Sequence, residues 1–333
     1  SHLETNPPSY WRLVMTQPVQ IVRYAELVPC RTAFIDAHTP GSDQKENFTI
    51  IGGGVSEAAD QHVHIKDTPG FNIGAAGQPP KCLNSLHSHR TAEVFFVLSG
   101  RWRFFWGRWG ETGEVILEAG DIFNIPTGMF RGFENIGSDY GMIMAILGGD
   151  DAGGGVIWAP QVIEDAKDHG LVLGENGKLY DNKKNEVLPK NVAPMPLMTD
   201  EHLALMAEPA VYEVIPRWVA RYLDLLALSA NGPIEVIGQN GQIFDRPGFT
   251  VDFVSGQSAG PIAPTPFYTV LIPVKGYWRL NQNEHASHIG PGDTAFLQPN
   301  TGYDVTPAMS GEAAFYRIQN TNDPAGPTWW ERS

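Results

Sequence analysis

Short apolar runs that end at glycine-containing turns recur along most of the chain, and they predict β-strands. "VFFVLSG" (94–100) and "TVLIPVKG" (269–276) are β-branched or aromatic runs closed by a glycine. "WRFFWGRWGETGEVILEAGDIFNIPTG" (102–128) places further runs at the spacing of antiparallel hairpins. "MIMAILGG" (142–149) and "AAFYRIQN" (313–320) read as the closing strands of two units. Short strands with frequent turns predict an all-β sandwich or barrel architecture.

Three short signatures occur twice, in the same order, and indicate an internal duplication. They are Gly-Gln, Gly-x-Trp-Arg and Gly-Asp. They begin at residues 77, 100 and 120 in the first unit and at residues 256, 276 and 292 in the second. The spacings differ only by amounts typical of loops, so we predict two copies of one β unit.

The pattern changes between the two units, where helical periodicity replaces the short runs. "WAPQVIEDAKDHG" (158–170) predicts a helix with Pro160 near its start and Gly170 as its stop. "TDEHLALMAEPA" (199–210) predicts a second helix with Thr199 as N-cap. We therefore expect four parts: an N-terminal arm (1–50), a first barrel (51–150), a helical and irregular connection (151–235) and a second barrel (236–333).

Composition narrows the class of protein. Of the 333 residues, 42% are hydrophobic and 18% are charged, which suits a globular protein with a well-filled core. The net charge of −14 and the lack of a basic run argue against nucleic acid as a partner. No apolar run is long enough for a membrane span, no signal-peptide pattern opens the chain, and the two cysteines form no disulfide framework. We expect a cytoplasmic protein with a small-molecule substrate.

The richest chemistry lies in "HSHRTAEVFFVLSG" (87–100), which reads His87-x-His89-x-x-x-Glu93. Residues two apart on a strand point to the same face, so both imidazoles should face the same interior. Glu93 can return to the same point after a bend. Two imidazoles and a carboxylate suit Fe(II), Mn(II), Ni(II) or Zn(II), and they are the donor set of the facial triad that leaves positions open for substrate and O2.

These residues resemble the first motif of the cupin superfamily, G-x5-H-x-H-x3,4-E-x6-G, from its histidines onward. The opening glycine of that motif would be residue 81, which is Lys81. The second motif, G-x5-P-x-G-x2-H-x3-N, is matched in spacing by the residues at four of its five positions: Gly120, Pro126, Gly128 and Asn135. Two such units resemble a bicupin, which implies two tandem cupin barrels of the double-stranded β-helix or jelly-roll type with a short helical connection.

Arg131 stands where this family places its last metal-binding histidine. A guanidinium stays protonated and has no free lone pair for a metal. Three arrangements are open. Arg131 can turn away to pair with Glu134 or Asp139, it can point inward to bind an anionic substrate, or it can pair with Glu93 and replace the charge of the metal, which would make the site metal-free.

Two further pairs of histidines are candidate metal ligands. His62 and His64 are two apart and could reach a barrel mouth, although two surface histidines in an ordinary polar loop are the favoured interpretation. In the second unit, the positions of the two histidines and the glutamate hold Ala263, Thr265 and Thr269, and the second-motif region offers Tyr303 and Asp304. His285 and His288 should lie in a solvent-facing hairpin. We therefore expect the second barrel to hold no metal and to serve a structural or dimerising purpose.

The pocket beside the predicted metal site should be aromatic. Phe95 and Val97 share the parity of Glu93, and Trp102 and Phe104 share one face of the following strand. The resemblance implies a non-haem Fe(II) dioxygenase acting on a small aromatic or enolic, possibly anionic, substrate, with Arg131 orienting that substrate. The alternatives are an isomerase or lyase that uses its metal as a Lewis acid, and a non-catalytic bicupin that binds a small ligand. The resemblance also implies a homodimer.

Overall fold

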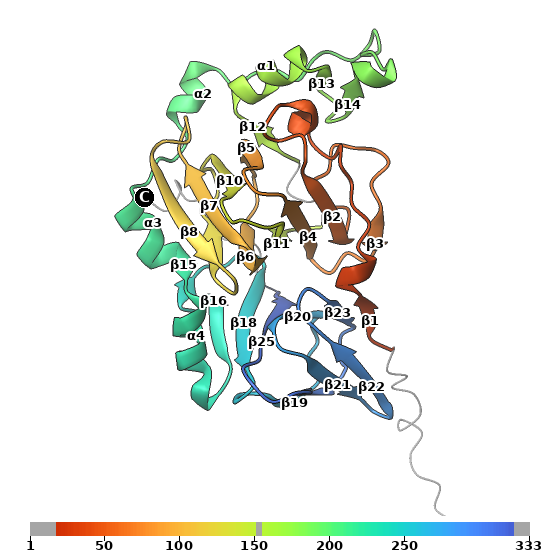
Figure 1. Cartoon of the computed structure of the whole chain (residues 1–333), viewed down its shortest axis with the longest axis vertical. Coiled ribbons are helices and arrows are strands. Elements are labelled where there is room, and N and C mark those ends of the chain that lie inside the picture. The colour runs from red at the N-terminus through yellow and green to blue at the C-terminus, as the bar shows by residue number, and fades with distance from the viewer. Residues whose placement is uncertain (1–17, 151–154, 323–333) are drawn as a thin grey trace, which may run out of the picture.

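Two β-barrels, one above the other along the long axis of the molecule, make up the fold (Figure 1). The computed structural model describes residues 18–150 and 155–322. The prediction of an all-β chain with two tandem barrels and a helical connection is confirmed.

The first barrel consists of two sheets that enclose a common interior. Its strands are β2 (Glu46–Ile51), β3 (Val63–Ile65), β4 (Phe71–Gln78), β5 (Leu83–Ser88), β6 (Glu93–Ser99), β7 (Arg101–Trp106), β8 (Gly113–Glu118), β9 (Ile122–Ile125), β10 (Arg131–Asn135), β11 (Gly141–Gly148), β12 (Ile157–Trp158) and β15 (Val219–Ala220). The larger sheet has the order β15-β9-β6-β11-β4-β2-β3, and the smaller has the order β12-β5-β10-β7-β8. The link from β5 to β6 therefore crosses from the smaller sheet to the larger one.

The second barrel repeats this plan with fewer strands. They are β1 (Gln20–Val22), β16 (Ile234–Gly238), β17 (Ile243–Phe244), β18 (Phe249–Ser255), β19 (Gly260–Ile262), β20 (Thr269–Lys275), β21 (Trp278–Gln282), β22 (His285–Ile289), β23 (Thr294–Leu297), β24 (Tyr303–Pro307) and β25 (Ala314–Asn320). One sheet has the order β1-β23-β20-β25-β18-β16-β17, and the other has the order β19-β24-β21-β22.

The remaining elements cover the outside of the barrels. They are the helices α1 (Pro160–Asp168), α2 (Asp200–Ala204), α3 (Val211–Trp218) and α4 (Tyr222–Leu228), the 3-10 turns η2 (Tyr24–Glu26), η3 (Ile35–His38), η5 (Asn182–Lys184) and η6 (Ser229–Asn231), and a small hairpin of β13 (Leu171–Leu173) and β14 (Leu179–Asp181). The hairpin and α1 cap the first barrel, whereas α3 and α4 run down one side of the molecule (Figure 1).

The two helices predicted in the connection form as α1 and α2, but the second is shorter than predicted, and α3 and α4 were not predicted. Thr199 caps α2 by accepting a hydrogen bond from the backbone N–H of His202. The helix ends at Ala204 because the next segment turns toward the first barrel, where Ala207 donates its N–H to the carbonyl oxygen of Gly128 at 3.2 Å. A tertiary contact therefore overrides the helical periodicity of residues 205–208.

The N-terminal segment contacts both barrels. Strand β1 pairs with β23 of the second barrel, and β2 begins at Glu46 and pairs with β4 of the first. Part of the segment assigned to the arm from the sequence is thus a sheet strand. The connection likewise contributes β12 and β15 to the sheets of the first barrel.

The duplicated signatures form the same local structure in both copies. In the first barrel the indole N–H of Trp102 donates to the carbonyl oxygen of Ser99 at 2.9 Å. In the second barrel the indole N–H of Trp278 donates to the carbonyl oxygen of Lys275 at 3.2 Å. In each case a glycine with positive φ lies between donor and acceptor, at residue 100 or 276. The sequence repeat is therefore a structural repeat.

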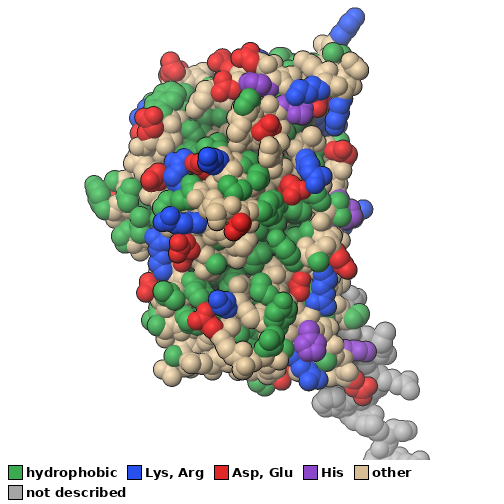
Figure 2. All heavy atoms as spheres, viewed as in Figure 1, with side chains coloured by type: hydrophobic (Ala, Val, Ile, Leu, Met, Phe, Trp, Pro, Cys, Tyr) green, Lys and Arg blue, Asp and Glu red, His purple; other side chains and the backbone are tan. Residues whose placement is uncertain are grey.

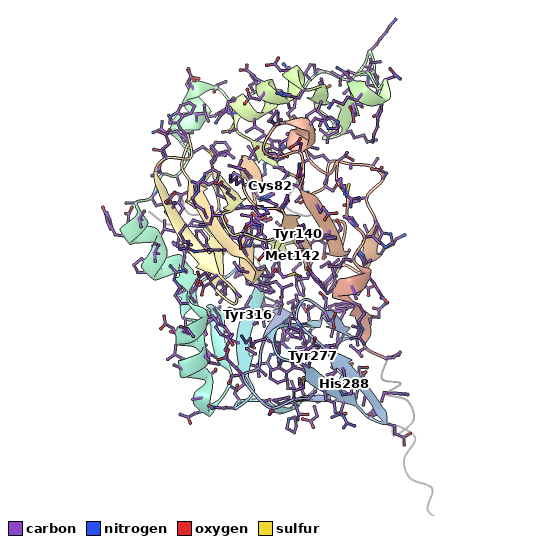
Figure 3. The ribbon with its side chains drawn as sticks, in the orientation of Figure 1. Cys82, Tyr140, Met142, Tyr277, His288 and Tyr316 are labelled. Carbon is purple, nitrogen blue, oxygen red and sulfur yellow. The ribbon has the colours of Figure 1, made fainter. Side chains whose placement is uncertain are left out.

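One hydrophobic cluster spans the junction of the barrels, with buried residues from both sheets of the first barrel, from the larger sheet of the second, and from α3 and α4. Tyr316 of β25 lies at this junction (Figure 3), where its hydroxyl donates to the carbonyl oxygen of Gly120 and its ring contacts Phe96 with centroids 4.8 Å apart. Asn124 donates to the carboxylate of Asp245 across the same junction at 2.8 Å. The second barrel thereby supports the sheet that carries Glu93.

Candidate metal centre

His87 lies near the end of β5, His89 directly follows that strand, and Glu93 opens β6 in the opposite sheet. The imidazole centroids are 5.1 Å apart. One possible ligand atom from each of the three side chains lies within 4.8 Å of the other two, and all three side chains are buried. The crossing from one sheet to the other therefore brings the three predicted ligands to one point inside the first barrel.

Backbone carbonyl groups set the orientation of both imidazoles. Nδ1 of His87 lies 2.8 Å from the carbonyl oxygen of Ser85, and Nδ1 of His89 lies 3.1 Å from that of Gly155. A carbonyl oxygen only accepts, so in the neutral ring Nδ1 carries the proton and Nε2 keeps its lone pair. Metal-binding histidines typically have their second nitrogen held in this way.

Arg131, the first residue of β10, is only 1% exposed, and its guanidinium binds Glu93. Nη2 and Nε both donate to Oε2 of Glu93, at 2.6 and 3.1 Å, and Nη1 donates to the carbonyl oxygen of Met129 at 3.1 Å. The same Oε2 lies 3.5 Å from Nε2 of His89. These contacts with Arg131 fix the position of the Glu93 carboxylate next to His89.

Of the three arrangements left open for Arg131, the structure has the pairing with Glu93. Glu134 is bound to Arg103 instead, at 2.7 Å. Asp139 contributes its backbone carbonyl oxygen to Asn135. Contact between Arg131 and a substrate stays a prediction.

The charges of the site are strongly coupled. Burial alone would raise the pKa of the Glu93 carboxyl, but His89 and Arg131 outweigh it and hold that pKa well below its usual range. Burial, followed by the nearby guanidinium of Arg131, lowers the pKa of His87, so the ring is neutral and available as a ligand.

A cavity of about 70 Å³ adjoins this cluster. Aromatic, small apolar and uncharged polar side chains form most of its wall. The lining residues are Cys30, Ala33, Phe34, Asn47, Phe48, Thr49, Gly54, Val55, Ser56, Asn72, Gly74, Ala75, Ala76, Asn84, His87, His89, Glu93, Phe95, Phe133, Ala145, Leu147, Val156 and Trp158. Glu93 is the only carboxylate among them, and no lysine or arginine lines the cavity.

The four predicted pocket residues occupy two kinds of position. Phe95 lines the cavity. Val97, Trp102 and Phe104 are buried in the core and are not among the lining residues. The ring of Phe104 packs against Phe95 with centroids 5.3 Å apart, so it supports the cavity wall from outside.

A buried polar network that sequence reasoning missed supports His87. Lys45 forms an ion pair with Asp36 and donates to Oδ1 of Asn84 at 2.8 Å. Asp36 also accepts from the backbone N–H of Ser85 at 3.1 Å. The network thus fixes Ser85, whose carbonyl oxygen binds Nδ1 of His87; Asn84 Nδ2 lies 3.2 Å from that nitrogen without a hydrogen bond, because both nitrogens carry hydrogen. Lys45 and Asp36 lie in the N-terminal segment, and no spacing in the sequence links them to the histidine motif.

Glu57 is a second residue that the sequence did not single out, and it anchors the loop that borders the cavity. Its carboxylate accepts from the indole N–H of Trp158 and from the backbone N–H of Ile35, each at 3.0 Å. Trp158 lines the cavity, and its ring centroid is 5.4 Å from that of His87. Burial raises the pKa of Glu57 from 4.5 to about 8, although the two hydrogen bonds oppose this shift.

The raised pKa of Glu57 predicts a specific pH dependence of stability. Between pH 4.5 and about 8 the folded chain retains a proton at Glu57 that the unfolded chain has released, so the free energy of unfolding falls as pH rises. This contribution has a limiting slope of about 1.4 kcal/mol per pH unit. We expect the variant E57Q to lack it, as measured by urea unfolding of both proteins at pH 5.5 and 7.5.

The matched control for this measurement is E111Q, since Glu111 is exposed in the turn between β7 and β8. This variant should keep the pH dependence of the unsubstituted protein. Equal slopes for E57Q and the unsubstituted protein would show that Glu57 is ionised in the folded state throughout this range.

The other histidines considered from the sequence do not join the cluster. Both ring nitrogens of His64 are occupied, because Nδ1 lies 2.7 Å from the carbonyl oxygen of Thr49 and Nε2 accepts from the N–H of Val28 at 3.1 Å. The ring of His62 packs edge-on against His64. His285 and His288 are exposed on β22, as expected, and Figure 3 shows His288 at the far end of the second barrel.

Within residues 18–150 and 155–322, His87, His89 and Glu93 form the only cluster of three or more potential ligands close enough to share an ion. None of the described residues of the second barrel belongs to such a cluster, and the absence of a metal from that barrel stays a prediction. Thr269 of β20, which occupies the position corresponding to Glu93, accepts a hydrogen bond from Gln319 at 2.9 Å.

The donor set of the first barrel fits a divalent metal. Metal–ligand bonds of about 2.0–2.2 Å place neighbouring ligand atoms roughly 3 to 3.5 Å apart, which matches the 3.5 Å between His89 Nε2 and Glu93 Oε2. The backbone-held tautomers and the ionised carboxylate supply the required lone pairs. Nε and Nη2 of Arg131 both donate to Oε2 of Glu93, so a metal would bind Oε1 or take the place of one of these two hydrogen bonds.

Residues 77–147 match the Cupin domain family, and the match contains His87, His89, Glu93 and Arg131. No curated protein is similar in sequence to the chain. Several solved structures share its fold at low sequence identity.

Salicylate 1,2-dioxygenase from Pseudaminobacter salicylatoxidans is 13% identical, with a TM-score of 0.52 over 95% of this chain and 90% of that chain. The oxalate decarboxylase of Lactobacillus farciminis, in a formate complex, is 11% identical, with a TM-score of 0.52 over 94% and 89%. Procruciferin, the 11S globulin from Brassica napus, is 11% identical, with a TM-score of 0.54 over 93% and 85%. Enzymes and a globulin thus share this fold, and the likeness does not decide the function.

None of the described helices combines the length and the apolar character of a membrane span. Charged side chains of both signs are interspersed over the face shown in Figure 2, without a continuous basic patch.

Proposed function

We propose that the chain is a two-barrel member of the cupin superfamily and a metal-dependent enzyme, whose first barrel binds one divalent ion through His87, His89 and Glu93. The observation that carries this proposal is the convergence of the three side chains to within 4.8 Å, with both histidines held through Nδ1. Two histidines and one carboxylate occupy one face of a metal and leave its other positions free.

An anionic substrate follows from the charges of the site. Arg131 already neutralises Glu93, and the ring of His87 is neutral, so these three side chains together carry no net charge. A divalent ion would add two positive charges in a buried site, where uncompensated charge is costly. A histidine in place of Arg131 would leave one positive charge fewer. We propose that the substrate brings a carboxylate or an enolate to offset this excess.

The cavity limits the size and shape of that substrate. Its volume of about 70 Å³ can hold only a few water molecules. Sites for drug-sized ligands typically have volumes of several hundred cubic ångströms. Phe95, Phe133 and Trp158 line it. These rings favour a small, flat substrate, and they exclude water from the polar end of the cavity.

We favour a non-haem Fe(II) dioxygenase, because the 2-His-1-carboxylate donor set is the one that Fe(II) oxygenases use. Bound Fe(II) would supply the site for O2 and for one substrate oxygen. His87 and His89 hold the ion, and the walls of the cavity orient the substrate. Arg131 acts through Glu93 as a positioning residue, since its guanidinium keeps the carboxylate ionised and directed toward the histidines.

A second candidate reaction uses the same residues without O2. A lyase or isomerase would use Mn(II), Ni(II) or Zn(II) to polarise a carbonyl group of the substrate. The small cavity of about 70 Å³ favours this candidate, because a short carboxylic acid needs less space than an aromatic one. A non-catalytic binding protein is the remaining alternative, and it is favoured by the Arg131–Glu93 ion pair, which neutralises the carboxylate without a metal.

The proposal is tested by elemental analysis of protein purified without chelators, followed by O2 uptake with catechols, gentisate-like acids and flavonols. We expect about one ion per chain, consistent with a single three-ligand site, and O2 uptake with the smaller acids. A metal content below about a tenth of an ion per chain, with no gain after Fe(II), Mn(II) or Ni(II) is added, would exclude both enzyme candidates. Metal without O2 uptake would favour the lyase or isomerase.

A further inference from the structure

A second cavity, of about 450 Å³, lies on the outer side of β5, and we propose that it is a binding site for a small amphipathic carboxylate. Nothing in the proposed reaction requires it, and the inference stands whether or not the first barrel binds a metal. We call this cavity the α2 groove. It is lined by Ser88, His89, Arg90, Thr127, Ile157, Met198, His202, Leu205 and Met206.

Apolar side chains from the connection form the walls of the α2 groove. Met198 and Met206 flank α2, and both pack partly against the core cluster beneath. Leu205, which follows α2, is 74% exposed and adds a further apolar side chain to the wall of the groove. Methionine side chains adapt to ligands of different shape, which suits an apolar binding surface. The volume also lies within the range typical of small-molecule sites.

A buried hydroxyl group provides a second, independent indication of a ligand. Ser88 lines the groove and is 1% exposed, and among residues 18–150 and 155–322 its Oγ has no hydrogen-bond partner. Buried polar groups are nearly always paired, and an unpaired one in a cavity wall calls for a partner in that cavity. The hydroxyl can donate to a ligand oxygen.

The positive charge of Arg90 at the edge of the α2 groove indicates that the ligand oxygen is anionic. Arg90 is exposed at the groove and makes no ion pair within the described ranges. His202 adds a second nitrogen donor, and no acidic side chain is among the lining residues. A free guanidinium at an apolar groove is notable in a protein of net charge −14. Its planar fork matches a carboxylate, and a single cation suits a monoanion better than a phosphate dianion.

The α2 groove and the metal cavity meet at one side chain. His89 is a lining residue of both. Its Nε2 lies 3.5 Å from Glu93 on the inner side, whereas its Nδ1 is bound to the carbonyl oxygen of Gly155. A ligand in the groove would therefore contact a residue of the metal cluster without entering the metal cavity.

Calorimetric titration of the full-length protein with decanoate, with decanol in parallel, tests the inference. We expect decanoate to bind with one site per chain, and R90Q to weaken decanoate at least about tenfold while leaving decanol unchanged, as the loss of one charge-assisted hydrogen bond implies. L205E should weaken decanoate by at least as much, because its carboxylate repels that of the ligand.

The matched controls are R279Q and L223E, since Arg279 and Leu223 are exposed on β21 and α4, and Leu223 is 72% exposed. Both controls should bind decanoate as the unsubstituted protein does. Absence of decanoate binding at millimolar concentration, or equal weakening by the controls, overturns the proposal. Binding that R90Q weakens equally for decanoate and decanol overturns the carboxylate assignment. Since the readout is decanoate binding, failure here leaves the metal test of the first barrel unaffected.

Discussion

Replacing His89 with alanine is expected to abolish metal binding by the first barrel. His89 supplies one of only two nitrogen donors, and its Nε2 faces the carboxylate of Glu93. Loss of a residue that merely supports a ligand already lowers metal affinity by about 10- to 100-fold, so loss of the ligand itself should exceed about 100-fold. The measurement is the metal content of H89A after dialysis against a buffer of fixed free Mn(II) or Fe(II).

The control for H89A is H288A, because His288 is an exposed histidine at the far end of the second barrel. This variant should retain the metal content of the unsubstituted protein. H87A should behave like H89A, which guards against a folding defect peculiar to one position. Metal binding that survives both H87A and H89A would place the ion elsewhere and contradict the proposed centre.

Replacing Arg131 with methionine is expected to lower the free energy of unfolding of the metal-free protein by about 3–5 kcal/mol, the usual effect of removing one partner from a buried ion pair. Arg131 is 1% exposed and holds Oε2 of Glu93 through two N–H groups. Methionine fills similar space but leaves the carboxylate without its cation. Urea unfolding of the metal-free proteins measures this difference.

Divalent metal should restore more stability to R131M than to the unsubstituted protein. In the variant the ion replaces the missing cation beside Glu93, whereas in the unsubstituted protein the guanidinium already offsets that charge. The control R101M removes an exposed ion pair with Glu118 and should cost no more than about 1 kcal/mol. Equal stabilisation of R131M and the unsubstituted protein by Mn(II) would mean that the metal does not contact Glu93.

Arg131, in place of the histidine of the second motif, changes the charge and the number of ligands of this site. A histidine at position 131 would add a neutral ligand, whereas Arg131 adds a positive charge and no ligand. The metal is then held by three side chains instead of four, and the anionic partner becomes part of the charge balance. Substrate charge should therefore matter more here than in a four-ligand site.

Local sequence patterns predicted the parts of this protein that depend on near neighbours. The apolar runs and glycine turns predicted two tandem barrels, because a strand requires only that alternate residues suit opposite faces. The duplicated signatures predicted equivalent turns, which Trp102 and Trp278 form with the same hydrogen bond. The His87-x-His89 spacing likewise predicted two imidazoles on one face, because that outcome depends on the pleat alone.

Contacts between distant segments were beyond the reach of such patterns. The sequence left three partners open for Arg131, and the choice of Glu93 depends on how β10 of one sheet faces β6 of the other across 38 residues of chain. Lys45 and Asp36 reach His87 from the N-terminal segment, and Glu57 reaches Trp158 across 101 residues. Nothing in the local spacing of these residues records their partners.

The sequence by itself therefore determined the two barrels and the three donors of the candidate metal centre, because these follow from backbone periodicity and a short turn. The tertiary structure decided the partner of Arg131, the closure of the cavity by Trp158 and the N-terminal segment, and the α2 groove beside His89. These features depend on which surfaces meet when sheets and connections pack. Packing is set by shape and burial over the whole chain, which the order of residues in one segment does not reveal.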